Sequence, residues 1–408
     1  MSKIKIFAAI VISINISLAQ NNLDDYMKEA AENNLDLKES FLEYQMALEK
    51  IPQVGSLPDP KVLFGYFVSP AHKPGSQQFK VSISQAFPWF GTLGTKENIA
   101  TANAKAKYEQ FLNKKNQIFF EVSKRYYKLY ELHKKIKLTE ENIRILNSYE
   151  KLALNKYETA QINMVDILKI QMTENEVKND LSVLKDDFKI LESYFNNVLN
   201  RDNKEEIKLP ESINIPTYES SLQDENEDEH ISGNPVLRFF DFEIESNRHK
   251  SDLASKNYFP NFGIGLDYIY VENDNTPKGG PDMLMPMISI NIPIFYSKYQ
   301  AKKKESKLGI ELAKHKKQRL HNDLVISYRE YKKDIKNAFR SIKLYETQLK
   351  KSNQALSILL DTYSVAEKNL EEVLNMKQVI LKYEFMLIES NIKVLVQTAK
   401  EKFLKGSF

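Results

Sequence analysis

Proline is confined to two parts of this chain. All fourteen prolines lie between Pro52 and Pro88 or between Pro210 and Pro293, so residues 89–209 and 294–408 contain none. Proline interrupts helix interiors because it has no backbone N–H and its ring clashes with the preceding turn. The sequence therefore predicts a proline-punctuated block, then a long helical block, and then the same two blocks again.

The two halves also match residue by residue at an almost constant offset. Phe87-Pro88-Trp89-Phe90 corresponds to Ile292-Pro293-Ile294-Phe295, and Tyr157, Ala160 and Asn163 correspond to Tyr363, Ala366 and Asn369. A colinear series of matches with a period of about 200 residues indicates an internal duplication rather than an array of short repeats. We expect a first repeat over 20–200, an acidic linker over 201–232 and a second repeat over 233–408.

Four segments of about ten residues alternate between apolar and polar side chains. They span residues 61–68, 78–87, 262–271 and 283–293. This pattern is typical of outer-membrane strands, whose apolar side chains face lipid and whose polar ones face inward. A soluble sheet with one wet face would alternate in the same way. Aromatic residues at the strand ends favour the membrane, and we expect an interfacial girdle of Phe87, Trp89, Phe90, Phe295 and Tyr296.

Four strands are too few to close a barrel. Small closed barrels need about eight strands, and an unpaired sheet edge is not tolerated in lipid. The sequence therefore predicts an oligomer, most simply a trimer with a shared barrel of about twelve strands.

The proline-free blocks predict long helices. The expected helices are 22–50, 92–160 and 164–200 in the first repeat and 235–257, 298–365 and 369–404 in the second. Apolar residues recur along them at three- and four-residue spacing, whereas the remaining positions are rich in Lys, Glu and Asn. Such helices fit the wall of a helical tube or bundle. The fold class is thus a mixed α+β membrane protein with a long helical barrel.

The N-terminus and the composition narrow the function. Residues 1–19 carry two lysines, an apolar run and a small-residue end, which is typical of a secretory signal peptide. The chain has no cysteine, so it offers no disulfide, lipid attachment or thiolate site. We find no Ser/His/Asp set, phosphate loop or His-rich cluster. We therefore expect no enzyme activity, no cofactor, no metal centre and no binding to nucleic acid.

At this point the chain resembles the TolC family of outer-membrane efflux ducts. The motifs that carry the resemblance are Leu57-Pro58-Asp59-Pro60, Ser84-Gln85-x-Phe87-Pro88-x-Phe90-Gly91, Asn234-Pro235-x-Leu237, Tyr258-Phe259-Pro260 and Ile292-Pro293-Ile294-Phe295. The first two are most similar to ducts of heavy-metal exporters. The resemblance implies a homotrimer in the outer membrane with a helical tunnel in the periplasm. Its implied partners are a periplasmic adaptor and an inner-membrane pump of the resistance-nodulation-division type.

The resemblance also implies a gate where the helical hairpins end. Glu372, next to Glu371, takes the place of an acidic residue that rings the constriction. Asp166 takes the place of an aspartate that a tyrosine and an arginine hold in the closed state, and Tyr363 and Lys368 align with that pair. Lysine in place of arginine loses the bidentate fork.

The same resemblance assigns the hairpin tips to adaptor contact. The tip residues are Ala160, Asn163, Ala366 and Asn369. The family usually has glycine where this chain has the two alanines. A left-handed turn costs alanine about 1 kcal/mol or more relative to glycine.

Two questions stay open at this stage. A periplasmic coiled-coil adaptor or scaffold would explain the helices, although it would not explain the four strands. The cargo is also open: Met283, Met285 and Met287 share one strand face, and thioethers suit Cu(I). Ordinary filling of the barrel interior would place methionine there too.

Overall fold

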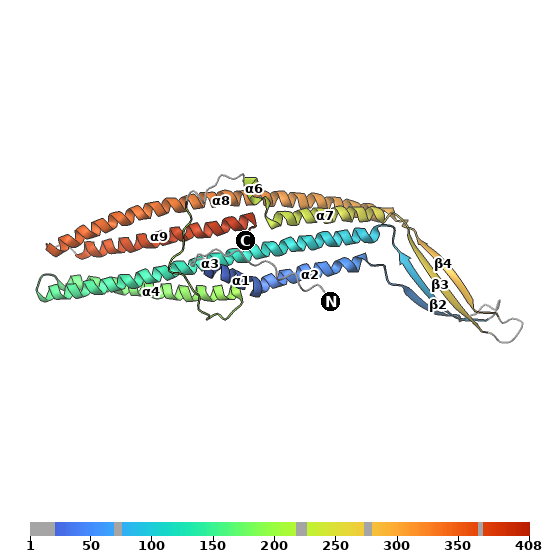
Figure 1. Ribbon diagram of the computed structural model, residues 1–408, viewed down its shortest axis with the longest axis horizontal. Helices are drawn as coiled ribbons and strands as arrows, with labels where there is room; N and C mark the ends of the chain where they lie inside the picture. Colours follow the sequence, from blue (N-terminus) through green and yellow to red (C-terminus); the bar gives the residue numbers. More distant parts are fainter. Residues whose placement is uncertain (1–20, 69–75, 218–226, 273–279, 366–369) are drawn as a thin grey trace. The chain divides into compact units, whose positions relative to one another are not determined.

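The computed structural model describes residues 21–68, 76–217, 227–272, 280–365 and 370–408. The predicted signal peptide lies outside these residues, as do two strand-connecting loops and part of the acidic linker. The described helices and strands, most of which are labelled in Figure 1, are α1 (Asn21–Asn33), α2 (Leu35–Gly55), β1 (Lys61–Tyr66), β2 (Ser76–Phe87), α3 (Thr92–Glu158), α4 (Met164–Leu199), α6 (Glu227–Ser232), α7 (Pro235–Lys256), β3 (Asn261–Glu272), β4 (Met283–Asn291), α8 (Tyr296–Val365) and α9 (Leu370–Lys405).

The chain divides into two compact units. Unit 1 takes residues up to 38, 114–232 and 324–408, and unit 2 takes 39–113 and 233–323. The order of a helix, two strands, a long helix and a shorter helix occurs twice, as α2-β1-β2-α3-α4 and α7-β3-β4-α8-α9. The long helices α3 and α8 have 67 and 70 residues. Neither contains proline, which is why nothing interrupts them.

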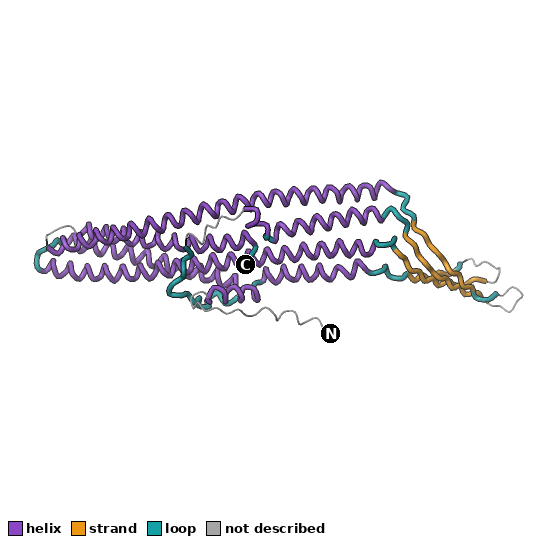
Figure 2. The backbone as a smooth tube through the Cα atoms, turned by 45° about the horizontal axis from the view of Figure 1, so that its top comes forward, coloured by secondary structure: helices purple, strands orange, loops and turns teal. Residues whose placement is uncertain are grey.

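Unit 2 contains one antiparallel sheet in the order β1-β2-β3-β4, whose strands lie side by side in Figure 2. Ser82 of β2 pairs with Asp267 of β3, and Asp267 pairs with Met285 of β4. Ser82 and Asp267 are buried, and Lys80 forms an ion pair with Asp267. The polar side chains of β2 and β3 thus lie on the covered face of the sheet.

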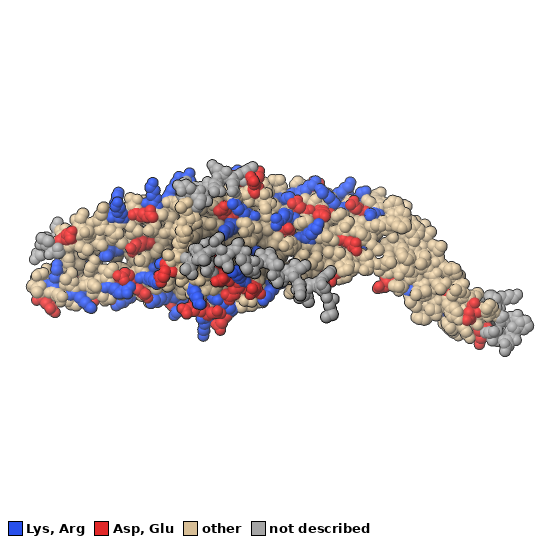
Figure 3. All heavy atoms as spheres, viewed as in Figure 1, with Lys and Arg blue, Asp and Glu red and all other residues tan. Residues whose placement is uncertain are grey.

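The opposite face of the sheet is apolar and exposed. Its exposed side chains include Val62, Phe64, Phe79, Ile83, Ile264, Leu266, Ile288 and Ile290. Figure 3 shows few charged atoms over the strands. A soluble sheet with one wet face buries its apolar face and exposes its polar face to water. This sheet does the reverse, and it is called inverted below for that reason.

Unit 1 is built from two antiparallel helix pairs, α3 with α4 and α8 with α9 (Figures 1 and 2). The largest fully buried side chains include Tyr126 of α3 and Tyr328 and Tyr331 of α8. Burial raises the pKa of Tyr127, which lies beside this core, to about 12, and the charge of Asp24 adds to the increase. Among the described residues, no helix is long and apolar enough to cross a membrane.

The helix expected over 22–50 is divided at Asn34 into α1 and α2. The Asn34 side chain accepts a hydrogen bond from the Leu37 backbone N–H (3.0 Å) and donates one to the carbonyl of Val198 (2.7 Å). The first contact caps α2, and the second attaches the break to the end of α4. Helix α2 then continues through Pro52 to Gly55.

The acidic linker also contains a short helix that the sequence did not predict. In this helix, α6, the Glu227 carboxylate accepts hydrogen bonds from Nε (3.1 Å) and from Nη2 (2.9 Å) of the Arg329 guanidinium. This short helix is therefore attached to α8 rather than free in solvent.

Candidate functional site

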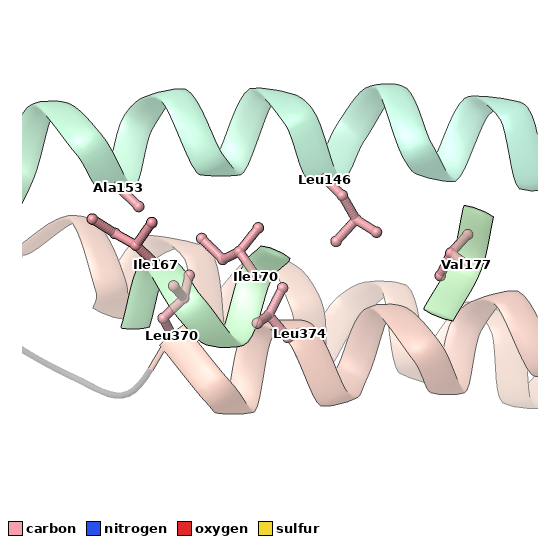
Figure 4. Close-up of a cluster of buried hydrophobic side chains, with 7 residues drawn as sticks. All are labelled: Leu146, Ala153, Ile167, Ile170, Val177, Leu370 and Leu374. Carbon is pink, nitrogen blue, oxygen red and sulfur yellow. The ribbon is translucent and has the colours of Figure 1, made fainter. Parts of the chain in front are cut away.

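The ends of the two helical hairpins meet in an apolar cluster. Seven buried side chains from α3, α4 and α9 form it, and Figure 4 labels them: Leu146, Ala153, Ile167, Ile170, Val177, Leu370 and Leu374. Tyr363 of α8 packs against the same cluster. The two hairpins of one chain are therefore in contact at their tips, at the place where the sequence predicts a gate.

The tip of the first hairpin is a tight left-handed turn. The Ala160 N–H donates to the Tyr157 carbonyl (2.9 Å), and the Gln161 N–H donates to the Lys156 carbonyl (2.9 Å). This pair of bonds is the Schellman arrangement, which needs a left-handed residue at its centre. Ala160 takes that place with φ of 57°. Alanine thus occupies the strained backbone position that glycine would fill without cost.

Asp166 lies in the first turn of α4. Its carboxylate accepts a hydrogen bond from the Asn163 backbone N–H (3.4 Å). An acidic side chain here also interacts favourably with the positive end of the helix dipole. Both effects stabilise the start of α4 immediately after the tip turn.

Tyr363 is half-buried in the tip cluster, and it contacts its neighbours mainly through its aromatic ring. Burial raises the pKa of its hydroxyl, and the charge of Asp166 adds to the increase. No described residue forms a hydrogen bond with that hydroxyl. The Lys156 ammonium lies 3.9 Å from the centre of the Tyr363 ring and donates a hydrogen bond to the Tyr363 carbonyl (3.2 Å). Lys156 thereby connects α3 to α8 through a cation–π contact and a hydrogen bond.

A second lysine connects α4 to α9. The Lys169 ammonium lies 2.5 Å from a carboxylate oxygen of Glu371. The hydrogen bond and charge of Glu371 raise the pKa of Lys169, so this lysine stays charged at physiological pH. Both side chains are about half exposed (43 and 50 %), so solvent screens the pair. Glu372 is exposed and forms no ion pair with a described residue.

The predicted site residues are brought together in part. Asp166, Tyr363, Glu371 and Glu372 all lie at the hairpin ends. Lys368 lies outside the described residues, as do Ala366 and Asn369. Lys156 and Lys169 could not be predicted from the sequence, because nothing distinguishes them from the many other lysines of these helices.

The predicted aromatic girdle lies where the strands of unit 2 join its helices. The Trp89 ring stacks on Phe259 with centroids 4.7 Å apart and meets Phe90 edge-on at 5.6 Å. Tyr296 stacks on Tyr258 at 6.0 Å. Phe90 and Phe295 are exposed, whereas Phe87 and Trp89 are half-buried.

The three methionines of β4 lie on the same face of the sheet as Asp267, and Met285 among them is exposed. Met283, Met285 and Met287 pair in register with Ile269, Asp267 and Gly265 of β3. The methyl group of Met287 lies over Gly265, where a Cβ would approach it to 3.3 Å. Among the described residues, no group of three His, Cys, Asp or Glu side chains is placed to hold a metal ion.

Comparison with solved structures identifies the fold. No protein-family sequence model and no curated protein sequence matches the chain. The outer-membrane channel OprN is similar with a TM-score of 0.80 at 12 % identity, over 95 % of this chain and 90 % of that one. CusC gives 0.80 at 14 % identity, over 97 and 96 %. The outer membrane protein VceC from Vibrio cholerae gives 0.78 at 12 % identity, over 95 and 96 %. The TolC-type fold that the sequence resemblance predicts is therefore confirmed.

Proposed function

We propose that this chain, which has the fold of TolC-family outer-membrane channels, is the outer-membrane exit duct of a three-part efflux system. Three copies would close a barrel of about twelve strands, and their helices would form a tunnel in the periplasm. The duct itself would be passive. An inner-membrane pump of the resistance-nodulation-division type would supply the energy, and a periplasmic adaptor would join this pump to the duct.

The inverted sheet is the observation that carries this proposal. Ile83, Ile264 and Ile288 are exposed, whereas Ser82 and Asp267 are buried on the opposite face. Water disfavours such an arrangement, but lipid outside and water inside favour it. The two edge strands, β1 and β4, have unpaired backbone groups that lipid would not tolerate. Pairing of β4 with β1 of a neighbouring copy would satisfy them.

A periplasmic adaptor or scaffold is the alternative, and membrane fractionation separates the two. The duct should sediment with outer membranes, resist extraction by salt, and run in detergent as a single oligomer that dissociates on heating. An adaptor would be released by salt. If the purified chain is monomeric and gives no ion conductance in planar bilayers, the proposal is wrong.

The hairpin tips serve in this proposal as the periplasmic gate. Lys156 on Tyr363 and Lys169 on Glu371 tie the first hairpin to the second. Breaking both contacts would let the hairpins move apart and widen the tunnel entrance. Glu372 would form a ring of carboxylates there, which attracts cations. The tip turns would be the surface that the adaptor contacts.

A soft metal ion is the cargo that one specific observation favours. The methionine row of β4 would line the barrel interior, and thioethers bind Cu(I). Silver(I) is a suitable probe of the same softness. The variant with leucine at the positions of Met283, Met285 and Met287 should bind less Ag(I) by titration calorimetry, whereas the control Met172→Leu on exposed α4 should not. If the unchanged protein, the triple leucine variant and the control bind Ag(I) equally, the three methionines only fill space in the barrel.

A further inference from the structure

The side of β4 that faces lipid in the proposed duct continues into α8. Along β4 and the residues that follow it, large apolar side chains at even positions are exposed, namely Ile288, Ile290, Ile292 and Ile294. Tyr296, the first residue of α8, continues the same series and is also exposed. Tyr296 therefore marks the side of α8 that faces out of the duct.

The end of α7 supplies the partner of Tyr296. Tyr258, two residues after the end of α7, stacks on Tyr296 with ring centroids 6.0 Å apart. The Tyr258 ring also lies 5.7 Å from the ring of Tyr299. Tyrosine has an apolar ring and a polar hydroxyl, so it is typical of the boundary between the hydrocarbon and the headgroups of a membrane. The stacked pair thus marks the level at which the hydrocarbon ends.

Two lysines follow on the same side of α8. Lys303 and Lys307 come seven and eleven residues after Tyr296, a spacing that keeps all three on one helix face. Among the described residues neither lysine has an ion-pair partner, whereas the next lysine on this face, Lys314, pairs with Glu311 at 3.1 Å. Blue side chains are visible along α8 in Figure 3. The side formed by Tyr296, Lys303 and Lys307 is called here the α8 basic face.

The acidic residue of this part of α8 lies on another side of the helix. Glu305 is the only carboxylate between Tyr296 and Gly309. It is two positions from Lys303 and from Lys307, which turns it by about 200° around the helix. Glu305 lines a groove toward α7 together with Lys302. The positive charge of the α8 basic face is therefore not neutralised by a neighbouring carboxylate of this stretch.

The α8 basic face also lies at the height of lipid headgroups. Lys303 is about 10 Å and Lys307 about 16 Å along the helix from Tyr296. The headgroup region adds about 5–8 Å to each side of the hydrocarbon, and lysine side chains extend toward such a boundary. The ammonium of Lys303 can thus reach the phosphates. Lys307 is close enough to attract them, because salt screens charges only beyond about 8 Å.

We propose that the α8 basic face binds the phosphate of an anionic phospholipid in the periplasmic leaflet of the outer membrane. Lys303 and Lys307 bind the phosphate, and the stacked pair of Tyr258 and Tyr296 contacts the glycerol backbone. The exposed apolar side of β4 contacts the acyl chains. A phospholipid fits because apolar, aromatic and cationic side chains follow one another in the order of acyl chain, glycerol and phosphate. This inference rests on the proposed duct, since insertion of the sheet in lipid brings this face to a membrane.

Native mass spectrometry of the oligomer purified in detergent tests the site. Phosphatidylglycerol should bind more tightly than phosphatidylcholine, which has no net charge. Lys303→Gln with Lys307→Gln should weaken the binding of phosphatidylglycerol roughly thirtyfold, since each lysine near an anionic surface contributes about fivefold. Lys298→Gln with Lys302→Gln is the matched control. These two lysines each lie five positions earlier, about 140° around the same helix, and their loss should change the affinity by less than about twofold.

Equal weakening by both double variants would overturn the site, because it would show an effect of net charge alone. Equal affinity of the unchanged protein for the two lipids would overturn it as well. Inorganic phosphate should not displace phosphatidylglycerol, and displacement would show a site for free anions instead. An oligomer that conducts but has no preference for the anionic lipid overturns this inference and leaves the duct intact. A chain that stays monomeric and silent in lipid overturns both.

Discussion

Replacing Lys156 by methionine should shift the proposed gate toward its open state. Methionine keeps the apolar stem of lysine and removes the ammonium that lies over the Tyr363 ring at 3.9 Å and donates to the Tyr363 carbonyl. A partly exposed cation–π contact contributes about 1 kcal/mol, and a hydrogen bond from a charged donor about 1.5 kcal/mol. Since both share one ammonium, we expect a loss of about 2 kcal/mol per chain, which is roughly a thirtyfold change in the open-to-closed ratio.

Single-channel recording in planar bilayers measures this shift as open probability. Lys151→Met is the matched control, because Lys151 lies on the same helix, is exposed, and has no described contact with the second hairpin. The contacts of Lys156 with Tyr363 and of Lys169 with Glu371 are called here the latch. Two variants of Tyr363 distinguish a latch that depends on the aromatic ring from one that depends on the hydroxyl. Tyr363→Phe keeps the ring and should stay closed, since the hydroxyl has no hydrogen-bond partner among the described residues. Tyr363→Leu should open. If Tyr363→Phe opens the duct and Lys156→Met does not, the ring contact is not the latch.

Three further predictions concern the same tip. Ala160→Gly should stabilise the protein by about 0.5–1 kcal/mol in chemical unfolding, because glycine adopts the left-handed turn without strain but loses more backbone entropy; a lower unfolding midpoint would contradict this. Divalent cations should block the isolated duct, and Glu372→Ala should relieve the block, whereas Glu371→Ala should loosen the latch and leave the block in place. Glu371 raises the pKa of Lys169, so the Lys169–Glu371 ion pair stays formed as the pH rises from 6 to 9 and is lost only above the usual lysine pKa of about 10.5. The open probability should therefore be constant between pH 6 and 9. A step near pH 8 would show that this ion pair does not hold the gate closed.

The strands and long helices were predictable because each depends on local pattern. Strict alternation placed a strand over 262–271, and the structure has β3 at Asn261–Glu272. Absence of proline placed a helix over 92–160, and α3 spans Thr92–Glu158. Such signals lie within the segment itself, so no tertiary contact is needed to read them.

The break at Asn34 and the two lysine contacts depend on distant partners. Asn34 bonds to Val198, and Lys156 and Lys169 reach residues on the second hairpin more than 200 positions away. No local pattern marks these residues, since asparagine and lysine are both common in the long helices α3, α4, α8 and α9. The family resemblance predicts a gate at the hairpin tip, but the position of the family's arginine is occupied here by Lys368, so the resemblance gives no direct model for how this tip is held closed.

The pairing of β2 with β3 has a consequence for the order of events during biogenesis. Gln78 and Glu272 bond across 194 positions of sequence, so the centre of the sheet cannot form until the first helical hairpin and the linker have been made. During that interval the β1–β2 segment presents its apolar residues, among them Phe64 and Ile83, with no membrane around them. Pairings of such long range are slow and prone to aggregation while they wait. For the proposed duct we therefore expect a need for a periplasmic holding factor, and this need should be greatest early, before the second pair of strands arrives.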